Sequence, residues 1–464
     1  MPHKTRKLNL GMAAVIISLA WPTMLEQLMQ TAVQYIDTAM VGTIGTHATA
    51  AVGATSTVNW VIGSSTSALG IGFLSYIARA HGAGDREAAK RASAQAALIV
   101  LIVGTLFTVI CLSCANQIPL WMQVDVSIRL LASRYFAILY APMLFRTATT
   151  VFGMVLRAAG DTKTPMKIGI GVNLVNVVLN FLLIYPSRMI RICNMRIHVI
   201  GAGLGVEGAA IASALAFAAG GIWITAVLWR HPDISPRGQI FLPDGEILRP
   251  CLKVALPNML QRFGTSLGYV AFASMVNSVG EVATAAHTIA NTVESAFYIP
   301  GYGMQTAAAT LAGNACGAGD HKRMKELGTM FLPIEVILMV ISGGALYILS
   351  PYLVDLFSNS PEVIDLGTKV LRMVALSEPF YGVSIIVEGM MQGVGRTKIP
   401  FVYNIVGMWG VRIVGTYICT QLLGMGLVSA WACMIAHNML LFAVFLATYI
   451  SGRWNPLVQK EANR

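Results

Sequence analysis

Residues 81–85 read HGAGD, and residues 316–320 read CGAGD. Each of these short polar turns follows a long apolar run, and they are separated by 235 positions, the distance from Gly82 to Gly317. At the same offset, without a gap, PTML at 22–25 aligns with PNML at 257–260, and GDTKTP at 160–165 aligns with GRTKIP at 395–400. The chain is therefore an internal duplication, and its two halves are expected to share one fold.

The composition indicates a membrane protein. Hydrophobic residues make up 56% of the chain and charged residues 11%, with a mean hydropathy of +0.67, whereas a globular domain carries about 25% charged residues. Apolar runs long enough to cross about 30 Å of hydrocarbon as a helix are expected near 12–37, 49–75, 93–118, 128–156, 166–186, 205–229, 248–277, 283–312, 328–350, 364–392, 400–422 and 427–450. We therefore predict an all-α integral membrane protein of twelve transmembrane helices.

The duplication divides these helices into two six-helix lobes, predicted at residues 1–235 and 236–464. Because each half has an even number of spans, both halves enter the membrane from the same side. They are then parallel repeats, related by a pseudo-twofold axis along the membrane normal, and such folds place the substrate site between the repeats.

Lysine and arginine collect in alternate connections, including both GAGD turns, the central connection and the two ends of the chain. The positive-inside rule then places both termini and both turns in the cytoplasm, with the protein multi-pass in a bacterial inner membrane. The connection 187–200, with Arg188, Arg191 and Arg196, is an exception on the outer side. In the turns, glycine is expected at φ > 0 and aspartate as a helix cap.

The net charge of +11 therefore reflects topology and attraction to anionic lipid. Nucleic acid is not expected as a partner, because the charges lie in short connections between helices. No cleavable signal is predicted, since the first apolar helix is much longer than a signal core. The seven cysteines show no C-x-x-C spacing, and neither a metal nor a cofactor is expected.

Charged groups inside a membrane are rare and are functional candidates by default. On the first helix, Glu26, Gln30, Gln34 and Asp37 fall within an arc of roughly 80° at 100° per residue. On the fifth helix, Asn173, Asn176 and Asn180 form a second polar stripe. Two alternatives remain: Asp37 as a solvated residue at the helix end, and Glu26 as a helix-packing residue.

Several segments together resemble the multidrug and toxic compound extrusion (MATE) family of the MOP flippase superfamily. They are Pro22 about four turns before Asp37, the two GAGD turns, GDTKTP at 160–165, NVVLN at 176–180 and GLGVEGAAIAS at 203–213. The resemblance covers about Leu10 to Ser451. It implies a V-shaped molecule of two six-helix lobes that exports organic cations in exchange for protons or sodium.

The resemblance also implies a cation-coupling site at Asp37, Asn176 and Asn180. Some members carry a second acid where this chain has Asn180, so only one carboxylate titrates in this cluster. Gln34 and Glu26 are predicted to contact substrate, and Pro22 is the predicted hinge, since proline weakens a helix by removing one amide hydrogen. Protonation of Asp37 from outside would remove a buried charge, let the first helix repack at Pro22 and release substrate outward.

The second half differs in its acids. The repeat partner of Asp37 is Phe272, and the seventh-helix glutamate and tenth-helix aspartate of the NorM branch fall near Thr265 and Tyr381. That branch's sodium site is therefore not expected. One face of the eighth helix carries His287, Asn291, Glu294, Tyr298 and Gln305. Of these, Asn291, Glu294 and Tyr298 are predicted to bind substrate, with an internal hydrogen bond as the alternative for Glu294.

The tenth helix carries two further acids, Glu378 and Glu388. Glu388 lies about two turns from the basic loop at 396–398, where a structural ion pair is the simpler interpretation. Neither residue can be assigned to function or to structure from the sequence alone.

The energy source follows by exclusion. The chain has no G-x-x-x-x-G-K-[ST] phosphate loop and no kinase or hydrolase signature. We therefore predict that it is not an enzyme but a transporter driven by an ion gradient. We expect it to be a monomer that transports small organic molecules. A lipid-linked oligosaccharide flippase remains the alternative, although a pyrophosphate carrier should line its cavity with several cations. A membrane scaffold or receptor is disfavoured by the polar stripes.

Overall fold

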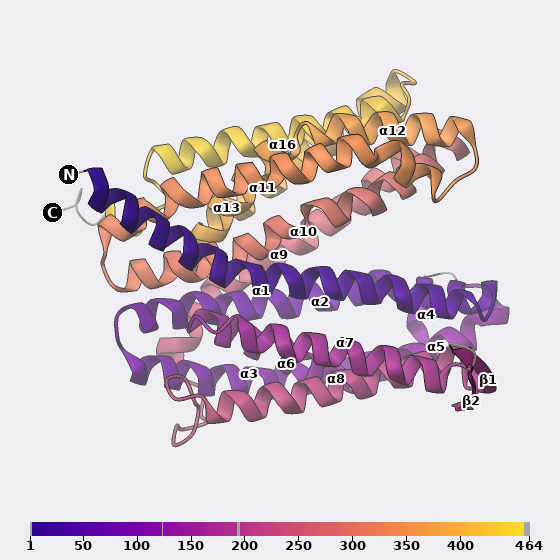
Figure 1. The fold of residues 1–464 in the computed structure, drawn as a ribbon, viewed down its shortest axis with the longest axis horizontal. Coiled ribbons are helices and arrows are strands. Elements are labelled where there is room, and N and C mark those ends of the chain that lie inside the picture. The colour runs from indigo at the N-terminus through magenta and orange to yellow at the C-terminus, as the bar shows by residue number, and fades with distance from the viewer. Residues whose placement is uncertain (1, 123, 193–194, 459–464) are drawn as a thin grey trace. The chain divides into compact units, whose positions relative to one another are not determined.

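The chain folds almost entirely into helices (Figure 1), and the computed structural model describes residues 2–122, 124–192 and 195–458. The first repeat contains α1 (Pro2–Gly42), α2 (Thr46–Gly82), α3 (Arg86–Ser113), α4 (Gln117–Trp121), α5 (Val126–Tyr140), α6 (Met143–Ala158), α7 (Lys163–Leu183) and α8 (Gly205–Arg230). The second contains α9 (Gly245–Asn277), α10 (Glu281–Gly317), α11 (His321–Asp355), α12 (Pro361–Ala375), α13 (Glu378–Gly393), α14 (Lys398–Ile405), the π-helical η1 (Val406–Ile413), α15 (Val414–Tyr417), the π-helical η2 (Ile418–Leu422) and α16 (Leu427–Ile450).

These elements match the twelve predicted spans. Among the described residues, eight helices are long and apolar enough to cross a membrane, and ten if each of two bent pairs counts as one. The pairs α5–α6 and α12–α13 bend by 49° and 52°, next to Pro142 and Pro379, because proline cannot donate a backbone hydrogen bond. The more polar α9 and α10 occupy the predicted seventh and eighth spans. The predicted fold class is confirmed.

Contacts between Cα atoms divide the chain into two compact units. The N-terminal unit comprises residues 25–73 and 86–248, and the C-terminal unit comprises residues 1–24, 74–85 and 249–464. Each unit has its own apolar core: Phe136 and Tyr140 are central in the first, and Phe331 and Phe445 are central in the second. The lobe boundary predicted near residue 235 remains a prediction.

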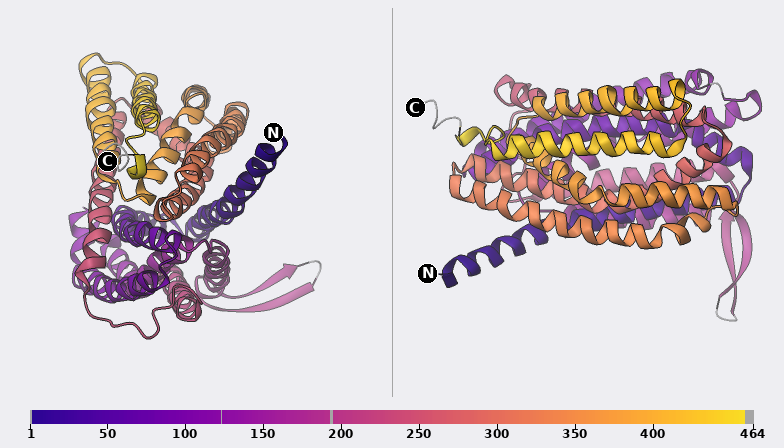
Figure 2. Two further views of the ribbon diagram at one scale, coloured as in Figure 1. Left: turned by 90° about the vertical axis from the view of Figure 1, so that its left-hand side faces the viewer. Right: turned by 90° about the horizontal axis from the view of Figure 1, so that it is seen from above.

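A β-hairpin replaces the loop expected between α7 and α8. Strands β1 (Pro186–Ile192) and β2 (Met195–Ala202) pair antiparallel, with Met189 opposite His198. Figure 2 shows the hairpin extending sideways from the ends of α7 and α8 within the N-terminal unit. At its base the Arg188 guanidinium lies 4.0 Å from the Tyr185 ring centroid. The side chains of residues 190–197 lie outside the described part of the structure. They include Arg191 and Arg196, the other two arginines of the connection that departs from the positive-inside rule.

The GAGD turns have the predicted geometry. Gly84 and Gly319 have φ of 76° and 65°, and Asp320 Oδ1 accepts from the Arg323 amide at 2.9 Å. The first glycine of each motif has a second role, because a Cβ on Gly82 would strike the Asn314 backbone, and one on Gly317 would strike the Arg79 backbone.

These contacts are reciprocal. The same offset of 235 positions that relates Gly82 to Gly317 also relates Arg79 to Asn314, so the ends of α2 and α10 approach each other through equivalent atoms. All four residues belong to the C-terminal unit. The repeated turn is therefore both a tight connection and a close contact between the two copies.

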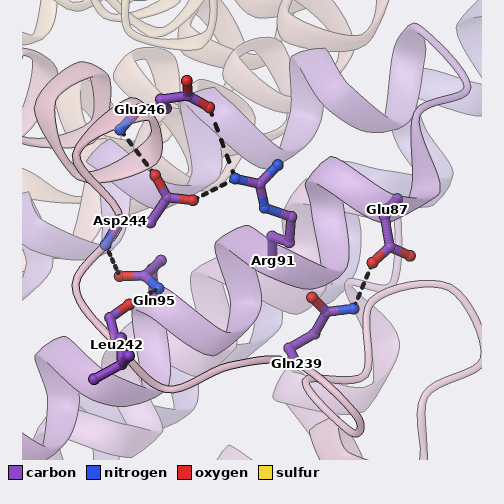
Figure 3. A network of polar contacts seen from close by, with 7 residues as sticks. All are labelled: Glu87, Arg91, Gln95, Gln239, Leu242, Asp244 and Glu246. Carbon is purple, nitrogen blue, oxygen red and sulfur yellow. Dashed lines mark hydrogen bonds and ion pairs between the residues drawn. The ribbon is translucent and has the colours of Figure 1, made fainter.

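The connection between the repeats is held against α3 (Figure 3). Arg91 Nη2 lies 2.5 Å from Asp244 Oδ2, and Gln95 Nε2 donates to the Leu242 carbonyl at 2.7 Å. Asp244 also caps α9, since its Oδ1 accepts from the Glu246 amide at 2.9 Å. The hydrogen bond from Arg91 holds the pKa of Asp244 below its usual value. The contribution of this interaction to the stability of the folded protein is present when the pH is above the ordinary pKa of an aspartate. It is lost as the pH falls through the lowered pKa of Asp244.

Candidate functional site

The N-terminal unit brings the predicted cation-coupling residues together. Asp37 is half-buried on α1, and Asn180 and Asn176 are buried on α7. Asn180 Nδ2 donates to Asp37 Oδ1 at 2.6 Å. The alternative in which Asp37 is merely a solvated residue at the helix end is therefore not favoured, since the carboxylate is tied to a neighbouring helix.

The Asn176 amide completes the cluster. In the orientation that satisfies Asp37 and Ser213, its nitrogen donates to Asp37 Oδ1 and Oδ2 at 2.9 and 3.1 Å, and its oxygen accepts from Ser213 Oγ at 2.9 Å. Both Asp37 oxygens then receive amide donors, the arrangement that stabilises an ionised carboxylate. Ser213, on α8, was missed by the sequence analysis, because a lone serine in a helix carries no signal of its own.

The remaining residues of the first stripe are placed differently. Gln34 is exposed one turn before Asp37, so it neighbours the cluster without joining it. Pro22 is buried within α1, which is one continuous helix from Pro2 to Gly42. Its role as a hinge stays a prediction.

Glu26 takes part in an ion pair. Its Oε2 lies 2.5 Å from Arg157 Nη2 on α6, with side-chain exposures of 23% and 8%. The carboxylate group also packs against Gly169 of α7, where a Cβ would come 3.2 Å from Glu26 Cγ. This geometry supports the helix-packing interpretation, and a contact of Glu26 with substrate stays a prediction.

In the C-terminal unit, the predicted face of α10 is mostly buried. Glu294, His287 and Gln305 are 7%, 9% and 8% exposed, Tyr298 is half-buried and Asn291 is exposed. Glu294 interacts electrostatically with Arg412, which stacks over the rings of Phe272 and Tyr269 at 4.3 and 4.8 Å. The assignment of the α10 face to substrate stays a prediction.

Glu388 is held by amides where an ion pair was expected. Its Oε1 accepts from Gln261 and Gln392 at 2.9 and 3.1 Å, and its Oε2 accepts from Asn404 at 3.2 Å. These donors come from α9, α13 and α14, so Glu388 connects three helices. The interpretation as a structural residue gains support, although its partners differ from those expected.

The two positions that match the NorM-branch acids, Thr265 and Tyr381, carry uncharged hydroxyl groups that form hydrogen bonds with other uncharged groups. The Tyr381 hydroxyl lies 3.3 Å from the Tyr302 hydroxyl, and Thr265 Oγ1 donates to the Gln261 carbonyl at 2.9 Å. A buried acid on α11, Glu335, was missed by the sequence analysis, because a single glutamate in an apolar helix forms no stripe.

These features define a class. The protein is a helical membrane protein with an internal duplication, and side-chain amides bind carboxylates on its membrane helices. This is the architecture of a secondary transporter. The MatE family model matches residues 22–182 and 257–418. The chain belongs to the MatE family, and the resemblance inferred from the sequence is confirmed.

Similarity to individual proteins extends over nearly the whole chain. The probable multidrug resistance protein NorM of Thermotoga maritima is 25% identical over 439 residues, which are 95% of this chain and 92% of that protein. The multidrug resistance protein MdtK of Yersinia pseudotuberculosis is 23% identical, over 88% and 87% of the two chains.

Solved structures share the fold. A crystal structure of MATE in complex with MaD3S superposes with a TM-score of 0.88 at 24% identity, covering 96% of this chain and 97% of the other. A MOP superfamily transporter from Pyrococcus furiosus, described as having a binding pocket of reverse polarity that suggests a different function, gives a TM-score of 0.86 at 25% identity and 96% coverage of both chains.

Proposed function

We propose that the protein is a secondary active efflux antiporter, which exports organic cations and other amphipathic compounds in exchange for protons. The observation that carries this proposal is the Asp37 cluster, where a membrane-embedded carboxylate receives amide donors from Asn180 and Asn176. The names of the relatives NorM and MdtK as multidrug resistance proteins support the same class of substrate.

The chemistry of the cluster explains how a proton would act. An ionised carboxylate only accepts hydrogen bonds, whereas a protonated one carries an O–H donor. With amide nitrogens directed at both Asp37 oxygens, the cluster stabilises the ionised form of the carboxylate. Protonation removes the charge and turns these charge-assisted hydrogen bonds between α1 and α7 into weaker neutral ones. We infer that α1 then repacks, with Pro22 as the weak point of the helix.

The gradient is large enough for this work. A proton moving down 100 mV releases about 2.3 kcal/mol, and each unit of pH difference adds about 1.4 kcal/mol. Together these terms support roughly a ten- to several-hundred-fold substrate gradient per proton.

Each of four interior arginines already has a contact partner, which makes it less available to bind an anionic substrate. Arg157 pairs with Glu26, and Arg412 stacks on Phe272 and Tyr269. Arg146 lies 4.9 Å from the Phe217 ring centroid, and Arg262 Nε donates to Asn258 Oδ1 at 2.9 Å. The flippase alternative requires free cations for a pyrophosphate, so we give it second place.

Uptake into proteoliposomes tests the proposal. Purified protein is reconstituted, and accumulation of a fluorescent organic cation is followed under an imposed pH gradient and, separately, under a sodium gradient. We expect uptake only under the pH gradient and its collapse with a protonophore. Uptake driven by sodium alone would reassign the coupling ion, and movement of a lipid-linked pyrophosphate with no movement of the cation would support the flippase.

A further inference from the structure

The C-terminal unit contains a carboxyl group with no charge partner. Glu335, in the middle of α11, is 0% exposed, and neither of its carboxyl oxygens has a hydrogen-bond partner within the described residues. The group occupies space that glycines leave open, since a Cβ would come 2.8 Å from Oε1 at Gly301 and 3.1 Å from it at Gly382. Met339 and Ile385 are the other close neighbours of these glycines.

This environment selects the protonation state. An isolated buried charge is strongly disfavoured in an apolar site, and more so within a membrane. No cation forms an ion pair with Glu335 among the described residues. In this arrangement the carboxyl group is therefore neutral and carries a proton.

A second carboxyl group lies close to it. Glu378, in the first turn of α13, is 2% exposed, and its Oε2 has no hydrogen-bond partner within the described range. It lies four residues, about one helical turn, before Gly382, against which the Glu335 side chain packs. Its own Cβ packs against α11, 3.3 Å from where a Cβ on Gly343 would lie. Neighbouring carboxylates in a dry site cannot all be ionised, so they share protons.

The other ionisable groups do not neutralise this pair. Arg412 acts on Glu294, and His287 stacks edge-on against Phe272 and Trp431. The neighbouring helices also carry phenols, Tyr298 and Tyr302 on α10 and Tyr381 on α13, and a phenol supplies no positive charge. From α12, Asp365, Lys369 and Arg372 line a separate crevice with Tyr347. A proton is also a better occupant than a metal ion, since no metal-binding group of three His, Cys, Asp or Glu residues occurs in the part described.

We propose that Glu335 and Glu378 form a second proton-carrying site, in the C-terminal unit and separate from Asp37. The pair holds a proton in the dry arrangement seen here, and the carboxyl O–H bond breaks to give the proton to water when another stage of the cycle hydrates the site. This inference rests on the proposed proton antiport and extends it, because the exchange then involves two protons per substrate.

Infrared spectroscopy of the purified full-length protein tests the protonation directly. The C=O stretch of a protonated carboxylic acid is separate from the two bands of a carboxylate. We expect Glu335→Gln to reduce the protonated-acid band at neutral pH, and the double variant Glu335→Gln with Glu378→Gln to remove the contribution of the pair. The matched control Glu362→Gln, at an exposed glutamate on α12, should leave it unchanged. A band unaffected by both interior substitutions would overturn the proposal.

Stoichiometry in proteoliposomes tests whether the proton is carried. We expect the number of protons exchanged per substrate to fall by about half in Glu335→Gln. If Glu335→Gln is not stably folded, Glu378→Gln takes its place and should show the same loss. An unchanged stoichiometry in a folded variant would overturn the proposal even if the infrared band falls. The proton would then stay bound to the pair throughout the transport cycle and would not be carried. If the unmodified protein exchanges no protons at all, the proposed antiport fails, and with it the carrying role, whereas the infrared band still reports whether the pair is protonated.

Discussion

Asn180 Nδ2 on α7 lies 2.6 Å from Asp37 Oδ1 on α1, although 143 positions separate the two residues. The contact joins the only carboxylate of the predicted coupling cluster to a helix that has no acid of its own in that cluster. Protonation of Asp37 therefore has a direct structural consequence, because it changes the hydrogen bonds between two helices.

The ion pair of Glu26 and Arg157 is predicted to stabilise the N-terminal unit. Arg157→Ala leaves a carboxylate of 23% exposure without its partner, and breaking a buried pair costs about 3–5 kcal/mol. We expect a clear drop in the melting temperature in detergent, and a smaller drop in the double variant Glu26→Gln with Arg157→Met, which removes both charges.

The pair of Arg134 and Glu207 is the matched control for this experiment. Its atoms are 3.1 Å apart, but the side chains are 60% and 33% exposed, so Arg134→Ala should cost less than about 1 kcal/mol. Equal losses in Arg157→Ala and Arg134→Ala would contradict a structural role for the buried pair.

Glu294 is predicted to distinguish charged from neutral substrates. Glu294→Gln keeps the size of the side chain, so binding of a cation should weaken by about 1–3 kcal/mol, the usual range for losing a charge-assisted hydrogen bond. A neutral ligand of similar size should bind unchanged. Equal losses for both ligands, measured on purified protein, would remove Glu294 from the substrate site.

Both GAGD turns are predicted to be cytoplasmic. Cysteines are best placed at Ala83 and Ala318, because both are exposed and the neighbouring Gly84 and Gly319 need positive φ. In intact cells that express the otherwise cysteine-free protein, neither should react with an impermeant thiol reagent. Asn359→Cys should react, because it lies in the connection between α11 and α12, which the α11 span places on the opposite side of the membrane from the second turn. Labelling of one turn and not the other would break the parallel-repeat interpretation.

The close contact between α2 and α10 is predicted to tolerate no side chain. Gly82→Ala and Gly317→Ala each drive a Cβ into backbone atoms, and such overpacking costs about 1–3 kcal/mol. Gly344→Ala on α11 is the control, because no atom lies within 4 Å of its Cβ position. If all three variants melt at the same temperature, the contact contributes nothing to stability.

The sequence predicted the number and positions of the spans because apolar length and an ungapped repeat are strong local signals. Asp37, Asn176 and Asn180 were also predictable, since they form stripes at helical spacing. Ser213 and Glu335 were not, because each is a single polar residue whose partners come from other helices. The β-hairpin was missed for another reason: its two strands follow an apolar helix directly, at a place where a loop between two membrane spans was expected.

The central claim is that protonation of Asp37 couples the gradient to transport, and one measurement tests it most directly. Asp37→Asn and the unmodified protein are reconstituted at equal amounts, and uptake of a fluorescent organic cation is followed under the same imposed pH gradient. The amide mimics the neutral acid permanently, so we predict that the folded variant still binds the cation but shows no gradient-driven uptake. Uptake by Asp37→Asn at the unmodified rate would contradict the account.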